Sequence, residues 1–217
     1  MARKPYTYNE LIDLVGNDYA WRRKELKIIK DQIPSSPSPK QSAALRFCVP
    51  ILYAHWEGFV KKSCELYLEF VAKKYLKHSE LKPQFIALSL SKTLGNLEIK
   101  NIEERTKAVE FLINEIDKNS NMLTKNVIQT KSNLRYSVLE KILFIIGIDE
   151  TNFAHKRSLI NDLVDARNNI AHGDYLRVEY EAYNLMHQDT QQLMELLKTE
   201  IENAATLEEY KVKKASA

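Results

Sequence analysis

The 217-residue sequence predicts an all-α protein, a bundle of about six or seven helices. Apolar residues recur at spacings of three and four along most of the chain, which is the periodicity of an amphipathic helix. No stretch alternates apolar and polar residues between turn signals, as a half-buried strand would. Only five glycines and six prolines interrupt the chain, so we expect few turns and long helices. Hydrophobic residues make up 44% of the sequence, which is enough for one sizeable core.

The first predicted helix covers residues 6–32, inside an N-terminal segment that runs from 1 to 33. Trp21 stands directly before three cations in this helix. We expect the tryptophan to pack in the core and the cations to face solvent. Contact of this basic-aromatic cluster with RNA is the alternative. Proline and serine then alternate over residues 34–39, which excludes a helix and predicts an extended connector.

The longest predicted helix covers residues 40–77 and is apolar on nearly every side. This pattern predicts a position at the centre of the bundle. His55 shares a helical phase with apolar residues, so we expect a hydrogen-bonded core histidine. Glu57 needs a cationic partner if it is buried, and Arg167 is the candidate.

The same periodicity predicts five further helices. Residues 119–132 are rich in Asn, Thr, Ser and Lys, and we expect them to form an irregular connector. The whole chain, residues 1–217, is expected to form one domain. Its motif-bearing core is assigned to residues 40–175, its C-terminal helix to 176–210 and its frayed tail to 211–217. The predicted helices after the second cover residues 83–93, 101–117, 134–147, 154–172 and 178–209.

Composition limits the class of protein. The net charge of +3 is compatible with an RNA partner, but the charge taken alone favours an ordinary solvated surface. Cys48 and Cys64 lie about 24 Å apart on one continuous helix, too far for a disulfide, and two reduced thiols suit the cytoplasm. The N-terminus has no apolar secretory segment, and no apolar run approaches the ~18 residues of a transmembrane helix. We therefore expect a cytoplasmic protein.

One stretch concentrates polar functional groups inside an apolar helical pattern: residues 163–175, LVDARNNIAHGDY. Asn168 and His172 project away from the apolar stripe of this helix, and at a spacing of four they can touch. Gly173 breaks the pattern and is predicted to be the C′ residue. His172 then lies in the last turn, where the negative end of the helix dipole favours imidazolium. The stripe consists of Leu159, Leu163, Ala166 and Ile170.

Residues 167–172, R-N-x-x-x-H, resemble the R-x4-6-H motif of the HEPN superfamily, in which a polar residue follows the arginine. Residues 52–61, LYAHWEGFVK, resemble the first long helix of HEPN families near the RiboL-PSP and MAE_28990 groups. Residues 133–143 resemble the middle helix of these families, so the similarity covers residues 43–175 in the same order. The resemblance implies a HEPN-like helical bundle. It also implies a metal-independent endoribonuclease of a defence or toxin–antitoxin system.

The resemblance implies roles for the motif residues in cleavage by the RNA 2′-hydroxyl. His172 can take or give the proton, because imidazole titrates near neutral pH. Arg167 can hold the phosphate oxygens with its planar fork of donors. Asn168 can orient His172 or donate to phosphate. We expect a 2′,3′-cyclic phosphate product and no metal or cofactor. Supporting roles are expected for Glu57, Asn169 and Tyr175.

The spacing of the motif also predicts a homodimer. Arg167 and His172 are about 140° apart around one helix, so a single helix does not easily aim both at one phosphate. A two-fold dimer through the motif-helix face would bring two motifs together. In the families that the chain resembles, the active cleft lies between two such domains. We therefore expect an isologous homodimer with a composite basic cleft that binds RNA.

Three other interpretations remain open. The motif can be a polar helix end, with Arg167 in a salt bridge and His172 as a C-terminal cap. The domain can bind RNA, nucleotides or a protein without cutting. It can be a toxin held inactive by a separate nucleotidyltransferase-like antitoxin. In some related toxins a modified tyrosine stands two residues after the histidine, whereas Tyr175 stands three after His172. Metal-site, phosphate-loop and nucleophile motifs are absent from the sequence.

Overall fold

The computed structural model describes residues 5–94 and 102–213 and confirms the all-α prediction. This part of the chain contains seven α-helices, two short 3-10 helices and no strand. Its two isolated β-bridges each join a single pair of residues. The α-helices are α1 (Tyr8–Asp31), α2 (Pro39–Ala72), α3 (Pro83–Leu94), α4 (Ile102–Glu115), α5 (Tyr136–Ile146), α6 (Arg157–Ala171) and α7 (Tyr180–Thr206), and the 3-10 helices are His78–Glu80 and Glu150–Lys156.

Local capping chemistry explains where the first two helices begin. Thr7 accepts the backbone N–H of Glu10 at 3.2 Å, and the Glu10 carboxylate accepts the Thr7 N–H at 3.1 Å, so α1 starts with a capping box. Ser38 accepts the N–H of Gln41 at 3.2 Å and caps α2 directly before its first-turn proline. The Pro/Ser segment is therefore a short connector between two capped helices, as predicted.

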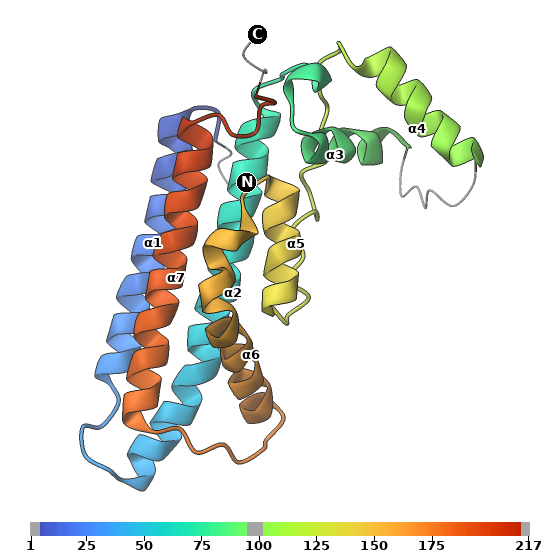
Figure 1. The fold of residues 1–217 in the computed structure, drawn as a ribbon. Helices are drawn as coiled ribbons and strands as arrows, with labels where there is room; N and C mark the ends of the chain where they lie inside the picture. Colours follow the sequence, from blue (N-terminus) through green and yellow to red (C-terminus); the bar gives the residue numbers. More distant parts are fainter. Residues whose placement is uncertain (1–4, 95–101, 214–217) are drawn as a thin grey trace.

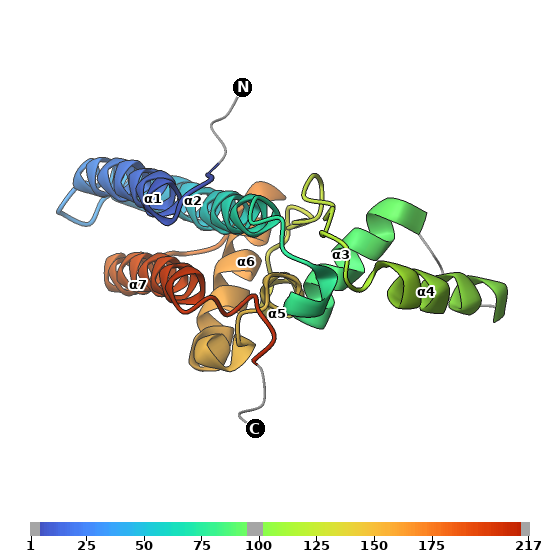
Figure 2. The ribbon, with the colours of Figure 1, turned by 90° about the horizontal axis from the view of Figure 1, so that it is seen from above.

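Helix α2 lies at the centre of the bundle, which confirms the prediction from its all-round apolar sequence. It packs against α1, α7, α6 and α5. In Figure 1 the long helices α1, α2 and α7 run side by side, and α5 and α6 cover a further side of α2. Figure 2 shows α3 and α4 projecting from the bundle at the end where α2 finishes. The helix ends at Ala72, before the predicted residue 77, and Tyr75 in the following turn has a left-handed backbone with φ +50°.

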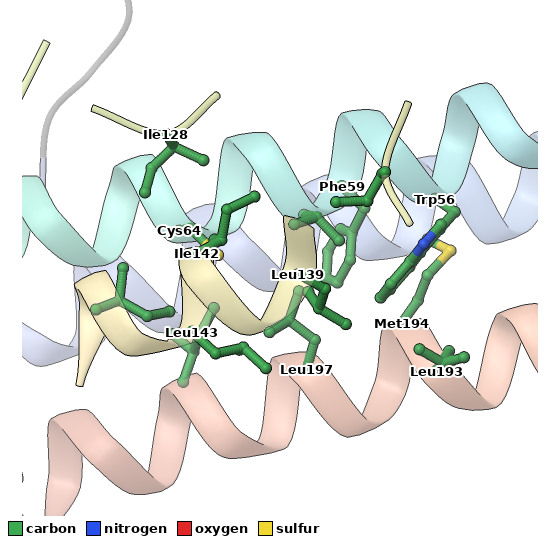
Figure 3. Packing of buried hydrophobic residues seen from close by; sticks show 14 of the residues in the cluster. Trp56, Phe59, Cys64, Ile128, Leu139, Ile142, Leu143, Leu193, Met194 and Leu197 are labelled. Atoms are coloured by element: carbon green, nitrogen blue, oxygen red, sulfur yellow. The ribbon is translucent and has the colours of Figure 1, made fainter. Parts of the chain in front are cut away.

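Three helices supply most of the core around the middle of α2. Figure 3 shows buried side chains of α2, α5 and α7 packed against one another. Cys48 and Cys64 are both free and buried, in agreement with the expected reduced thiols. Burial raises the pKa of the Cys64 thiol well above its ordinary value. Central members of this core are Trp56, Phe59, Leu139, Ile142, Leu143, Leu193, Met194 and Leu197.

The chain after α7 is better ordered than the predicted tail. The N–H of Lys82 donates to the carbonyl of Tyr210 at 2.9 Å, and the N–H of Val212 donates to that of Glu80 at 2.9 Å. The expected fraying therefore does not begin at residue 211, and residues 214–217 lie outside the described residues. No helix within the described ranges has the length and apolar character needed to cross a membrane.

Candidate functional site

Helix α6 carries the predicted motif and is fixed against α5 by polar contacts. The carboxylate of Asp165 forms an ion pair with Arg135, whose Nη1 donates to Oδ2 at 3.3 Å. The side chain of Asn161 accepts the N–H of Tyr136 at 3.1 Å at the start of α5. The predicted apolar stripe faces the core, with Leu163 buried and its other members partly buried against it. The orientation of the motif helix is therefore defined by packing on one side and by charge on another.

A Schellman motif ends α6 at the residues of the predicted site. His172 is the C-cap residue, and its backbone N–H donates to the carbonyl of Asn168 at 2.9 Å. Gly173 has φ +87°, and its N–H donates to the carbonyl of Ile170 at 3.2 Å. The N–H of Asp174 reaches the carbonyl of Asn169 at 2.9 Å. This confirms Gly173 as the predicted C′ residue, and it leaves the imidazole of His172 exposed.

Arg167 turns toward α2 and is half-buried there. Its guanidinium carbon lies 4.9 Å from the centre of the Tyr53 ring, a cation–π contact. Its Nη1 donates to Oδ1 of Asn168 at 2.8 Å. Asn168 therefore orients the arginine, whereas no hydrogen bond joins the side chains of Asn168 and His172 among the described residues.

Tyr53 joins three elements at this point. It is 1% exposed, and its hydroxyl accepts the backbone N–H of Leu134 at 2.8 Å just before α5. Burial raises the pKa of Tyr53 to about 12; the Glu57 carboxylate acts in the same direction and the Arg167 guanidinium against it. The phenol is consequently a neutral hydrogen-bond acceptor and a fixed floor for Arg167. Sequence reasoning did not single out this residue, although it lies four residues before Glu57 on the same face of α2.

Glu57 lies beside this cluster without the expected ion pair. Its Oε1 is buried and has no hydrogen-bond partner among the described residues. None of the ion pairs found in the described ranges joins it to Arg167. The prediction that Arg167 is its direct partner is therefore wrong in this structure, since both residues approach Tyr53 instead. The buried Oε1 of Glu57 can therefore still accept a hydrogen bond from a further donor.

The other motif side chains face solvent. Asn169, His172 and Tyr175 are exposed, and the Tyr175 ring is 80% exposed. Arg167 thus points inward over α2 while His172 points outward. This divergence agrees with the angle expected from their spacing. Within one chain the structure brings together Arg167, Asn168, Tyr53 and Glu57, and it does not bring His172 into contact with Arg167.

Arg46 is a further residue at this site that sequence reasoning missed. It lies on α2, its Nη2 donates to the carbonyl of Asp174 at 2.9 Å, and its guanidinium carbon is 5.3 Å from the centre of the Tyr175 ring. The contact connects positions 128 residues apart. Only the seven-residue spacing between Arg46 and Tyr53, which places both on one face of α2, could have indicated it.

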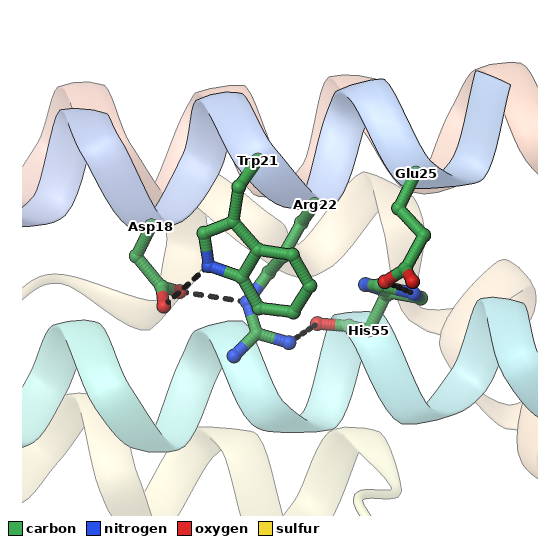
Figure 4. Close-up of polar contacts among 5 residues, drawn as sticks. All are labelled: Asp18, Trp21, Arg22, Glu25 and His55. Carbon is green, nitrogen blue, oxygen red and sulfur yellow. Dashed lines mark hydrogen bonds and ion pairs between the residues drawn. The ribbon is translucent and has the colours of Figure 1, made fainter. Parts of the chain in front are cut away.

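His55 belongs to a separate cluster between α1 and α2. It is buried, and its Nε2 lies 3.2 Å from the Glu25 carboxylate, which confirms the predicted core histidine. Figure 4 shows Arg22 held between Asp18 and the backbone of His55, at 2.7 Å and 3.4 Å. Trp21 is 47% exposed and lines a shallow pocket of about 380 Å³ there, so the prediction that it packs in the core is wrong.

No group of His, Cys, Asp or Glu side chains within residues 5–94 and 102–213 is placed to hold a metal ion. A family model described as RiboL-PSP-HEPN matches residues 17–203. The matched region includes α2, α5 and α6 and every site residue described above. No match to a curated protein or to a solved structure was found.

Proposed function

This chain belongs to the RiboL-PSP-HEPN family, and we propose that it is a metal-independent endoribonuclease that cleaves RNA by attack of the 2′-hydroxyl. The observation that carries the proposal is the end of α6. There Arg167 is held by Asn168 at 2.8 Å and by the Tyr53 ring at 4.9 Å, and His172 is exposed at the cap of the same helix. An oriented cation and an accessible imidazole are the two groups that this chemistry needs.

The proposed roles follow from what each group can donate or accept. A base removes the proton of the 2′-hydroxyl, the oxygen attacks phosphorus, and the 5′-oxygen leaves with a proton. His172 takes or gives these protons. Arg167 binds the non-bridging oxygens with the N–H donors that Asn168 does not use. The products are a 2′,3′-cyclic phosphate and a 5′-hydroxyl. Glu57 supports the site from beside Tyr53, and Asn169 supports it from the outer face of α6.

A homodimer through the motif face completes the proposed site. Within one protomer Arg167 faces α2 and His172 faces solvent, so one motif does not present both to a single phosphate. Two copies related by a two-fold axis would place the exposed His172 of one protomer near the motif helix of its partner. The exposure of Asn169 and His172 leaves this face open to a second copy.

The biological setting is proposed from the family. We place the protein in the cytoplasm, which suits its two free, buried thiols. Its activity would serve defence or a toxin–antitoxin pair, in which a separate nucleotidyltransferase-like protein acts as the antitoxin.

RNA cleavage in the presence of EDTA tests the proposal. We expect His172→Ala and Arg167→Ala to lower cleavage by at least about 100-fold, the scale on which general acid–base catalysis operates, and the wild-type products to end in cyclic phosphate. His155→Ala is the matched control for the histidine, because His155 is also exposed but lies before the start of α6. Arg157→Ala is the control for the arginine, because Arg157 also lies over a tyrosine ring, that of Tyr136 at 4.5 Å.

Light scattering on the same preparations reports the mass of the particle, which we expect to be that of two chains. Cleavage that survives His172→Ala would place the site elsewhere. Absence of cleavage by folded, dimeric wild type on several RNAs would favour a non-catalytic binding module. The separation of Arg167 from His172 within one chain is the observation that favours this second function.

A further inference from the structure

The segment after the α6 cap presents an aromatic ring to solvent in a fixed position. Tyr175 is 80% exposed, far more than the buried tyrosines of the core. An exposed tyrosine on a loose segment would need no explanation. This one follows a Schellman motif, and the guanidinium of Arg46 lies 5.3 Å from its ring centre.

Arg46 fixes the segment to the centre of the bundle. Its Nη2 donates to the Asp174 carbonyl at 2.9 Å, so the same guanidinium holds the backbone and lies over the neighbouring ring. Arg46 stands on the same face of α2 as Tyr53, about 10 Å away along the helix. Two cation–aromatic pairs therefore connect α2 with the end of α6. In the first, α2 supplies the ring of Tyr53 and α6 the cation of Arg167; in the second, α2 supplies the cation of Arg46 and the segment after α6 supplies the ring of Tyr175.

We propose that Tyr175 and Arg46 form a base-binding subsite, in which a nucleobase of single-stranded RNA stacks on Tyr175 next to the motif. The subsite rests on the proposed function for its place in the reaction, which is to hold the base that flanks the scissile phosphate. Arg46 occupies one side of the ring and leaves the exposed side to the base. The donors of Arg46 that do not bind Asp174 can reach the phosphate backbone.

The expected selectivity follows from stacking. Every base has an aromatic face, so stacking on tyrosine tolerates sequence but requires an unpaired base. Removal of one stacking ring weakens single-strand binding by between about 5-fold and 150-fold. Double-stranded RNA, whose bases are already stacked, should gain nothing from Tyr175.

Binding of uncleaved RNA tests the subsite separately from the reaction. The probe is a fluorescein-labelled oligouridylate, measured by fluorescence anisotropy with protein that carries His172→Ala. We expect Tyr175→Ala to weaken binding within the range above, and Tyr175→Phe, which keeps the ring, to bind as the parent does. Oligonucleotides that each carry one abasic site, placed at successive positions, extend the test. At one or more of these positions we expect the parent and Tyr175→Ala to bind with equal affinity, because the base that stacks on the ring is missing.

Variants of Arg46 distinguish the proposed arrangement from a simple charge effect. Arg46→Ala should weaken binding in the same direction. The double variant should cost less than the two single effects together, because the residues act as one unit. Arg46→Lys keeps the charge without the planar fork, so it should restore only part of the binding. Tyr75→Ala is the matched control: Tyr75 is 57% exposed beside Lys73, but it lies beyond the other end of α2.

The outcomes separate the subsite from the ribonuclease. Tyr175-dependent binding without cleavage by wild type would uphold the subsite and overturn the proposed reaction. Cleavage with KM and binding unchanged by Tyr175→Ala would overturn the subsite alone. If Tyr175→Ala changes the particle mass but leaves RNA binding per chain unchanged, the ring is a dimer contact, and the subsite is overturned. Absence of RNA binding by the folded parent would overturn it as well.

Discussion

Gly16 and Gly173 both have open space where a Cβ would lie, yet their backbones differ. Apart from the adjoining backbone and the neighbouring residues in the chain, no heavy atom comes within 4 Å of the Cβ position at either residue. Gly16 stands inside α1, where any L-residue is accommodated and glycine costs stability through chain entropy. Gly173 has φ +87°, a conformation that L side chains rarely adopt. A comparison of substitutions at the two positions therefore separates the effect of backbone conformation from that of side-chain packing.

Alanine at these positions should change stability in opposite directions. We expect Gly173→Ala to lower the free energy of unfolding by about 1–2 kcal/mol, because alanine is strained at this φ. Gly16→Ala should raise it by about 0.5–1 kcal/mol. Urea denaturation followed by circular dichroism measures both. Equal effects of the two substitutions would mean that the cap of α6 does not need its left-handed residue.

Elements that are distant in sequence meet at the Tyr53 hydroxyl. This single acceptor satisfies the N–H of Leu134 before α5, while its ring supports Arg167 of α6. Tyr183 offers a comparison, because it is also fully buried but its hydroxyl, close to the Cys48 thiol, has no hydrogen-bond partner among the described residues.

Tyr53→Phe should therefore destabilise the protein more than Tyr183→Phe. The first substitution leaves a buried N–H without a partner, which costs about 1–3 kcal/mol, and the second removes only an unpartnered hydroxyl. Chemical denaturation measures the difference, and equal stabilities would show that Leu134 finds another acceptor.

Local signals were sufficient to predict the helices, because each helix end depends on residues close in sequence. Ser38, Gly147 and Gly173 cap or close helices within a few positions of themselves. Contacts between helices depend on how the helices pack against one another, and the spacing of apolar residues along the sequence does not determine this packing. Arg46 was missed for this reason, because its partner is 128 residues away. The predicted pairing of Glu57 with Arg167 failed for the same reason, since the packed structure gives Arg167 the Tyr53 ring and the Asn168 side chain as partners.

The stability of the whole bundle should depend on pH through two buried histidines. Burial lowers the pKa of His55, and burial with the nearby Lys30 lowers that of His187, below the ordinary value of about 6.5. Just below pH 6.5 the unfolded chain binds protons that these native histidines do not, so the free energy of unfolding falls as the pH falls. Above this pH both histidines are neutral in the folded and in the unfolded chain, so they do not change the free energy of unfolding with pH.

Denaturation curves between pH 7.5 and 5 test this prediction. His55→Gln and His187→Gln should each flatten the fall in stability toward acid pH. His155→Gln serves as the control, because His155 is exposed and belongs to neither buried site. A wild-type stability that rises toward pH 5 would contradict the sign of the prediction.

The positions of the two tryptophans give this molecule an intrinsic optical readout. Trp56 is 1% exposed at the centre of the bundle, and Trp21 is 47% exposed on α1, where its indole N–H donates to Asp18 at 3.1 Å. A soluble quencher such as iodide should reach the fluorescence of Trp21 and spare that of Trp56. A red shift of the protected emission then reports loss of the core, whereas a change in the quenched emission alone reports a local event at the surface of α1. Loosening of the whole bundle can thus be told apart from a local change without any attached label.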